Sequence, residues 1–299
     1  MTGKSKQKLV LVGPCIGEMY WEFGRFAPYV MWKRENEYKS SNIKFVVLTR
    51  EGMFDLYAGC ASIFIPLFIP GDGTLYKANC FRLDDFPDDA YNFILKTFYN
   101  QYSKDNQIIE HIKPDISKKN FLNKNQFPRN KMSFNYYTRT ENRLTIEKNI
   151  DKKEFIILAP RYRQGLKRNW PYWQRLYDFI YDDKRLFEKY NFVICGKPPD
   201  YIPDKYERFY DINKLNTNQS VSLIGLTIES IKKAKLTIGS QSAIPNISLL
   251  LKVPVLEWGH QKQLHTIEYN PFKTKVTFIE DINYTIDPSI IYSEILKIL

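Results

Sequence analysis

The stretch Ser230–Gly259, SIKKAKLTIGSQSAIPNISLLLKVPVLEWG, constrains the fold more than any other part of the chain. It combines a helix end, an apolar strand (Leu236–Ile238), a polar turn (239–242), a helix through Leu251 and a second strand (Val253–Glu257). Short apolar runs separated by helical patterns are typical of parallel strands that are buried on both faces. The turn places backbone N–H groups and hydroxyls at a helix N-terminus, where phosphate or sugar oxygens bind without a charged side chain.

The same alternation of strands and helices extends over most of the chain. Further strands are expected at Leu9–Gly13, Ile43–Thr49, Ser62–Ile65, Glu154–Ala159, Phe192–Cys195 and Glu207–Ile212. Helices are expected after the glycine turn at Gly13, at Glu51–Tyr57, around Trp173–Ile180 with Pro171 in the first turn, near Ser220–Leu226 and Ile228–Ala234, and at Ser289–Leu299. The polar segment 98–150 is interpreted as a crossover that contains some helix. We therefore predict an α/β chain with two doubly wound, Rossmann-like domains, 1–150 and 151–299.

Composition limits the class of protein and its partners. The 299 residues are 43% hydrophobic and 15% aromatic, which indicates a globular chain and excludes a disordered one. A net charge of +11 suits an anionic substrate, a phosphorylated or nucleic-acid acceptor, or an acidic membrane surface. A generally basic surface with no specific anionic partner is the alternative.

The cysteine pattern and the hydropathy indicate the cellular compartment. The four cysteines show no CxxC pair and no metal-type spacing, which is typical of a reducing cytoplasm. No signal peptide is recognisable, and the most apolar run, Ala61–Pro70, is interrupted by Pro66 and too short to span a membrane. We expect a soluble, cytoplasmic protein (in the host's cytoplasm if the chain is viral).

With three histidines and no Asp-x-Asp at a strand end, we expect no catalytic metal.

A basic loop, Pro160–Asn169, follows the strand that opens the second half. Its cations are Arg161, Arg163, Lys167 and Arg168. At the carboxyl edge of a parallel sheet, such a loop is placed to bind a diphosphate. The alternative is a solvated basic loop with no ligand.

Two carboxylates, Glu18 and Glu22, lie one helical turn apart after the first strand. Carboxylates at this spacing share a helix face and can differ in pKa, so that one of them serves as a general base near neutral pH. The alternative is that both carboxylates lie at the helix N-terminus because the helix dipole stabilises negative charge there, with no catalytic role.

Two histidines and a tryptophan stand at or after the strand Val253–Glu257. His260 and His265 can meet the nucleotide base or the donor sugar there, and Trp258 can stack on a base. A solvent-facing histidine and a packed tryptophan are the alternatives.

These segments resemble the heptosyltransferase-like family of GT-B glycosyltransferases (glycosyltransferase family 9-like). The resemblance covers AKLTIGSQSAIPNISLLLKVPVLEWG, the loop PRYRQGLKRNWPYW and the turn CIGEMYWEFGRFAP. The chain departs from the family at Gln241, Ala243 and Asn246, where the family has Asp, Gly and His. The resemblance implies a GT-B fold in which two Rossmann-like domains bind donor and acceptor.

The resemblance also assigns roles to the candidate residues. It implies that the donor diphosphate is held by Arg161, Arg163, Lys167, Gly239, Ser240, Gln241 and Ser242. It implies donor base or sugar contacts from Asn246, Trp258 and His260. Glu18, or in the other register Glu22, would be the catalytic base, and we favour Glu18.

The function expected from these features is metal-independent, inverting transfer of a sugar from a nucleotide diphospho-sugar to an acceptor hydroxyl. The acceptor is a saccharide or a hydroxymethylated base in phage-type DNA. A non-catalytic sugar-nucleotide or glycan-binding module of the same fold is the alternative. A dinucleotide-dependent oxidoreductase is disfavoured because GPCIGEMYWEFG lacks the GxGxxG pattern after the first strand.

Overall fold

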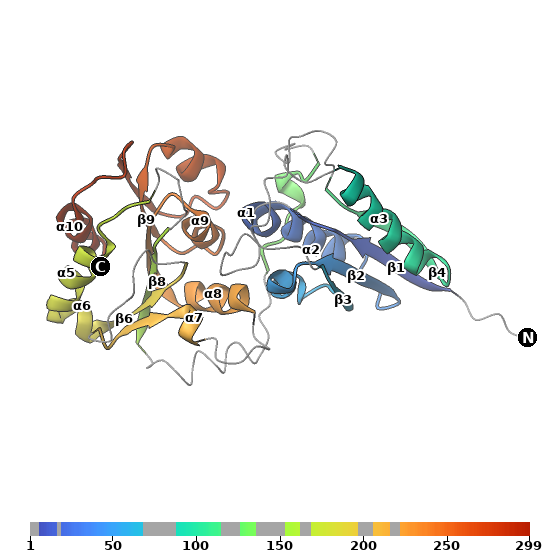
Figure 1. Cartoon of the computed structure of the whole chain (residues 1–299), viewed down its shortest axis with the longest axis horizontal. Helices are drawn as coiled ribbons and strands as arrows, with labels where there is room; N and C mark the ends of the chain where they lie inside the picture. The colour runs from blue at the N-terminus through green and yellow to red at the C-terminus, as the bar shows by residue number, and fades with distance from the viewer. Residues whose placement is uncertain are drawn as a thin grey trace, which may run out of the picture. The chain divides into compact units, whose positions relative to one another are not determined.

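A computed structural model of the chain describes residues 6–16, 19–67, 88–114, 126–135, 153–161, 169–196, 206–215 and 222–299 (Figure 1). It divides into two compact units, Met1–Arg139 and Thr140–Leu299. Each unit is an α/β domain built on one parallel sheet, which confirms the predicted fold class. The boundary that we placed at residue 150 lies outside the described residues and stays a prediction.

The first unit has a four-stranded parallel sheet in the order β3-β2-β1-β4. Its strands are β1 (Gln7–Val12), β2 (Ile43–Thr49), β3 (Ile63–Pro66) and β4 (Asn106–Ile112). The unit also contains the 3₁₀ helices η2 (Glu51–Tyr57) and η5 (Arg129–Lys131) and the helix α3 (Asp88–Ser103). Phe98 of α3 packs on Leu9 and Leu11 of β1, so this helix covers one face of the sheet (Figure 1).

A helix with a π-helical turn follows β1. It runs through α1 (Met19–Trp21), the π-helix η1 (Glu22–Phe26) and α2 (Ala27–Asn36), and the side chains of its inward face, including Phe23 and Val30, are buried. Pro28 lies in the first turn of α2, directly after the π-helical turn η1, so the hydrogen-bond pattern of the helix changes just before the proline and the chain continues as α2.

The second unit has a six-stranded parallel sheet. Its elements are β5 (Glu154–Ala159), α5 (Trp173–Asp182), α6 (Lys184–Lys189), β6 (Tyr190–Ile194), β7 (Phe209–Asp211), α7 (Ile212–Leu215), α8 (Leu223–Lys232), β8 (Ala234–Ser240), α9 (Ala243–Leu250), β9 (Val255–Gly259), η6 (Leu264–Glu268), β10 (Val276–Glu280) and α10 (Pro288–Ile298). The strand order β10-β9-β8-β5-β6-β7 is the 3-2-1-4-5-6 order of a Rossmann sheet counted from β5.

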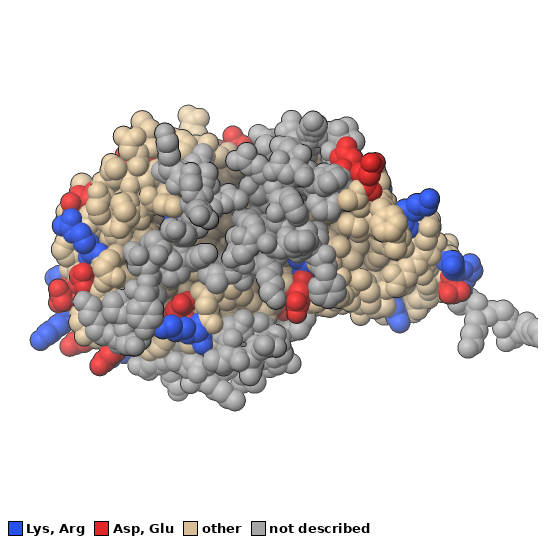
Figure 2. All heavy atoms as spheres, in the orientation of Figure 1, with Lys and Arg blue, Asp and Glu red and all other residues tan. Residues whose placement is uncertain are grey.

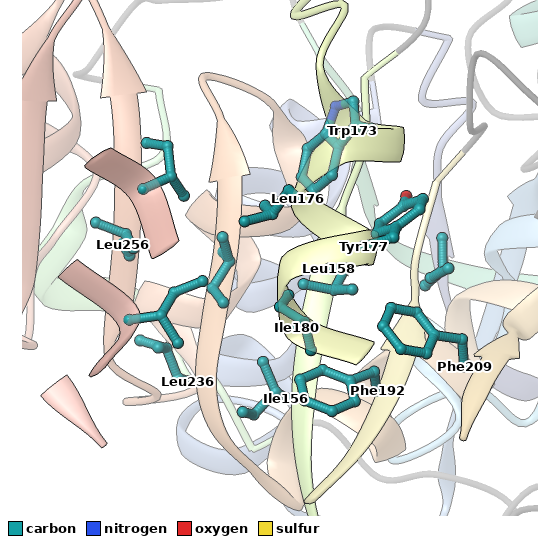
Figure 3. Packing of buried hydrophobic residues seen from close by; sticks show 14 of the residues in the cluster. Ile156, Leu158, Trp173, Leu176, Tyr177, Ile180, Phe192, Phe209, Leu236 and Leu256 are labelled. Carbon is teal, nitrogen blue, oxygen red and sulfur yellow. The ribbon is translucent and has the colours of Figure 1, made fainter. Parts of the chain in front are cut away.

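An aromatic and aliphatic core joins this sheet to α5 and α10. Trp173, Leu176, Tyr177 and Ile180 recur at helical spacing on α5 and are all buried against the strands (Figure 3). The other face of the sheet is covered by α8 and α9 (Figure 1). Burial on both faces explains why β5, β6, β8 and β9 read as continuous apolar runs.

Several sequence expectations are corrected. The strands β4 and β10 and the helix α6 were not predicted, and the two helices expected near 220–234 are the single helix α8. Both missed strands lie at sheet edges, and their half-exposed residues mix charged with apolar side chains, which weakens the strand pattern.

Charge and hydropathy can be compared with the structure directly. On the face in Figure 2, Lys and Arg side chains of the described residues are interspersed with Asp and Glu. Within the described ranges, no helix combines the length and the apolar character that crossing a bilayer requires.

Replacing Trp173 by alanine tests the core of the second unit. The indole is 1% exposed and packs on Trp170 and Trp258. Because a large buried ring is removed, Trp173→Ala is expected to lower the free energy of unfolding by about 3–5 kcal/mol in urea titrations. Trp32→Ala, at a half-buried position in the first unit, is the control and should cost much less. Equal losses would contradict this packing.

Candidate functional site

The strand order of the second unit reverses between β5 and β8. In open parallel sheets, ligands bind beyond the carboxyl ends of the strands at this reversal. The two segments that leave these ends are the one beginning at Pro160 and the turn Ser240–Ser242 before α9. The predicted basic loop and the predicted phosphate-binding turn are therefore neighbours at one edge of the sheet.

Arg161 joins these two segments. Its Nη1 donates a 2.7 Å hydrogen bond to the backbone carbonyl of Gln241. The guanidinium is thus held beside the β8–α9 turn, where a cation would meet an anionic ligand. Arg163 and Lys167 lie outside the described residues, so their part in a diphosphate site stays a prediction.

The turn itself is mostly buried. Gly239 packs against β5 and α9: a Cβ there would lie 2.9 Å from the Cβ of Ala159 and 3.2 Å from Cγ of Pro245. This glycine therefore allows close strand–helix packing. Ser240 is fully buried, and its Oγ has no hydrogen-bond partner among the described residues. Ser242 is half-buried at the start of α9 and forms no side-chain cap hydrogen bond.

Gln241 and Asn246 add two more buried polar atoms without described partners. Gln241 is 2% exposed and its Nε2 lacks a hydrogen-bond partner, while its Oε1 is engaged by neighbours. Asn246, on α9, is also buried, and its Oδ1 lacks a partner in the described part of the chain. Buried polar groups nearly always have a partner, so an edge with three such atoms has hydrogen-bonding capacity for a polar ligand.

Trp258 and His260 have different surroundings. Trp258 is fully buried, with its ring centroid 4.8 Å from that of Trp170 and 5.6 Å from that of Trp173. This packing in the core favours the alternative of a packed tryptophan over a donor contact. His260 is exposed just beyond β9, so a donor contact stays a prediction for it.

Sequence reasoning missed Tyr284. Its hydroxyl donates to Gln241 Oε1 at 2.7 Å and lies 3.3 Å from His260 Nδ1. The residue belongs to the polar loop after β10, a strand that was itself not predicted. No local sequence pattern in that loop indicates that Tyr284 contacts Gln241, which lies 43 positions away in the chain.

Glu22 lies within a buried polar cluster in the first unit. Its carboxylate accepts hydrogen bonds from Thr49 Oγ1 at 2.5 Å and Tyr57 Oη at 2.8 Å, and pairs with Arg50 Nη2 at 2.5 Å. Glu22 is fully buried and Arg50 is 2% exposed. Both carboxylate oxygens are occupied, which favours a structural role over that of a general base. Such a pairing was not among the alternatives considered from sequence.

Glu18, the favoured base, lies outside the described residues. The segment that precedes it leaves β1 at the point where the order of the first sheet reverses toward β4. His111 of β4 lies with Nε2 2.8 Å from the carbonyl oxygen of Gly13, and burial lowers the pKa of this imidazole. The role of Glu18 stays a prediction.

A second buried ionisable pair lies on β9 and η6. Glu257 Oε1 is 2.9 Å from His265 Nδ1, and both side chains are almost fully buried. Burial raises the pKa of the Glu257 carboxyl above its usual value, and His265 opposes this rise. Elsewhere in the described ranges, no group of three His, Cys, Asp or Glu side chains is arranged to hold a metal ion.

Comparison of the whole structure with solved structures identifies the fold. A family 9 glycosyl transferase from Veillonella parvula superposes with a TM-score of 0.56 at 11% identity, covering 98% of this chain and 97% of that one. The E. coli ADP-heptose lps heptosyltransferase II gives 0.58 at 12% identity, covering 97% of this chain and 98% of the other. The fold is GT-B.

The resemblance to heptosyltransferase-like structures is therefore confirmed at the level of the fold. A glycotransferase of kitacinnamycin superposes with a TM-score of 0.50 at 9% identity, covering 97% of this chain and 90% of that one. No protein-family model and no curated protein sequence matches the chain.

Removing the charge of Glu22 tests the buried cluster. Glu22→Gln leaves the Arg50 guanidinium buried without its anionic partner, so the free energy of unfolding is expected to fall by about 3–5 kcal/mol. Adding Arg50→Met should recover part of that loss. Glu37→Gln, at the more exposed ion pair with Lys33, is the control and should cost under about 1 kcal/mol in the same urea titrations. A loss from Glu22→Gln as small as the control's would contradict the assignment.

The Glu257 pair predicts a pH dependence of stability. A carboxyl whose pKa is raised by folding stabilises the fold below its unfolded pKa, and this contribution is lost as pH rises through the folded pKa. Relative to Glu257→Gln, the wild type should therefore lose stability as the pH rises above 4.5, the ordinary pKa of a glutamate carboxyl. Urea titrations from acid to neutral pH measure this difference, with Glu280→Gln, at the exposed last residue of β10, as the control. Parallel curves for wild type and Glu257→Gln would contradict it.

Proposed function

We propose that the chain is a glycosyltransferase that moves a sugar from a nucleotide diphospho-sugar to an acceptor hydroxyl. The observation that carries the proposal is the edge of the second sheet where Arg161 binds the β8–α9 turn. Buried polar atoms of Ser240, Gln241 and Asn246 lie on this turn and α9 without partners among the described residues. A GT-B neighbour is an ADP-heptose lps heptosyltransferase, which supports a nucleotide-sugar donor for this chain as well.

In the proposed reaction the acceptor oxygen attacks the anomeric carbon directly. Its proton passes to the Glu18 carboxylate as the bond between that carbon and the diphosphate oxygen breaks, and the configuration inverts. The leaving nucleoside diphosphate gains negative charge, which Arg161, with Arg163 and Lys167, would neutralise without a metal ion. Glu22 is assigned to holding Arg50 and the first helix in place, because its own carboxylate is enclosed.

Two acceptors are proposed, a saccharide from the family resemblance and a DNA base from the net positive charge. A saccharide and a hydroxymethylated base in DNA both carry a suitable hydroxyl, and the net charge of +11 is compatible with either, or with contact with an acidic membrane surface. Acceptor binding that weakens steeply with salt would favour DNA, whereas salt-tolerant binding would favour a neutral glycan.

A non-catalytic binding module is the second candidate. It is favoured by the neutral side chains Gln241 and Asn246 on the turn and α9, and by the enclosure of Glu22. The two candidates differ in one measurable property, since a transferase slowly hydrolyses a donor in the absence of acceptor and a binding module does not.

The experiment combines donor binding with turnover. A thermal-shift screen of UDP-, GDP- and ADP-linked sugars first identifies the donor, because a bound ligand raises the melting temperature by mass action. Glu18→Gln should then lower turnover about 10²–10⁴-fold without changing the Kd of the donor. Arg161→Gln should instead raise that Kd.

Glu35→Gln and Arg175→Gln, which change exposed residues of α2 and α5, are the matched controls and should leave both quantities unchanged. Full turnover in Glu18→Gln would refute the proposed base. Donor binding without any turnover or hydrolysis in the wild type would favour the binding module.

A further inference from the structure

The side chain of Gln241 is held in one orientation. Its Oε1 accepts hydrogen bonds from the backbone N–H of His260 at 3.2 Å and from the Tyr284 hydroxyl at 2.7 Å. A backbone N–H can only donate, so the carboxamide atom that faces it must be the oxygen. The opposite atom is therefore Nε2, an N–H₂ group that can only donate.

This N–H₂ group is buried and has no hydrogen-bond partner among the described residues. An unsatisfied buried donor costs free energy, and a ligand atom that accepts a hydrogen bond recovers it. A ligand that presents the proton of a hydroxyl group to Nε2 does not recover this free energy, because both groups are then donors. The orientation of one side chain thus selects for an acceptor oxygen.

Two further features support the carboxamide in this position. The side chain of Gln241 lies across the bare α-carbon of Gly259, whose φ is +154°, and a Cβ there would come within 2.5 Å of the carboxamide. Tyr284 has a φ of +57°, a conformation that costs free energy for a residue other than glycine. Its loop is closed by a 2.8 Å hydrogen bond from the Ile286 N–H to Asp281 Oδ2.

We propose that Tyr284 is a positioning residue that fixes the Gln241 carboxamide so that Nε2 donates a hydrogen bond to an acceptor oxygen of the nucleotide-linked donor. The proposal rests on the proposed function and adds the atom that recognises the donor. The matching group on the donor is an unprotonated oxygen, on a phosphate or on the sugar. A carboxylate at position 241, by contrast, would accept a hydrogen bond from a sugar hydroxyl.

Isothermal titration of the full-length chain tests the proposal. The ligands are inorganic pyrophosphate, UDP, GDP and ADP, their glucose conjugates, and the free nucleosides. Tyr284→Phe keeps the buried ring and removes the hydroxyl, so the Kd of the acceptor-bearing ligand is expected to rise about fivefold. Gln241→Met removes the donor at similar size and should raise it at least as much. Gln241→Glu, which places a carboxylate against that oxygen, should raise it more than tenfold.

Tyr292→Phe is the matched control. Its hydroxyl donates a 2.6 Å hydrogen bond to Asp183 Oδ2, so the substitution removes a comparable contact elsewhere in the same unit. It should leave every Kd unchanged. A general loss of structure in the other variants would also weaken binding of the free nucleosides, whereas loss of the Nε2 contact would spare them.

The side-chain amide signals of Gln241 in ¹⁵N NMR spectra give a second readout that needs no ligand. They are identified by their absence in Gln241→Met, and Tyr284→Phe should shift them while Tyr292→Phe does not. Weaker binding of pyrophosphate and nucleoside diphosphates would place the acceptor oxygen on a phosphate; an effect confined to the glucose conjugates would place it on the sugar.

Wild-type affinities in Tyr284→Phe and Gln241→Met for every ligand would overturn the proposal and leave the proposed function standing. A wild type that binds none of the ligands would overturn both.

Discussion

The hydrogen bond from Arg161 to the backbone carbonyl of Gln241 connects the two segments that leave the sheet where its strand order reverses. The contact depends on β5 and β8 being paired in parallel, because this pairing brings Ala159 level with Gly239 and lets both chains emerge together. Arg161 and the turn Ser240–Ser242 are both placed by this pair of strands. The arginine therefore stabilises the fold and supplies positive charge at the candidate site.

The strands with the clearest sequence signal are those whose surroundings are apolar on both faces, and the edge strands β3 and β7 were predicted as well. Ile156–Leu158 and Leu236–Ile238 lie in the middle of the sheet, so burial alone determines their composition. β4 and β10 lie at sheet edges, where one face and one side of each strand tolerate charge, and the apolar pattern is lost. The doubly wound α/β class was accessible from sequence because the central strands carry most of the pattern, whereas the GT-B architecture was implied by the family resemblance.

The candidate site was only partly accessible for a different reason. The turn at Gln241 has a local signature, but its partner Tyr284 belongs to a distant loop. Glu22 resembles a catalytic carboxylate until Thr49, Arg50 and Tyr57 are seen to enclose it, and these residues lie on another strand and helix. Sequence spacing identifies residues that share one element. It does not reveal which side chains from other elements occupy their polar atoms.

The bare α-carbon of Gly259 has a consequence for how this region can vary. Because Gly259 has no Cβ, the side chain of Gln241 can cross the end of β9 and reach Tyr284 in the loop after β10. An asparagine at position 241 would be one methylene too short to make this contact. The side-chain length at position 241 and the length of the loop 281–286 are therefore matched, and a change in either calls for a compensating change in the other.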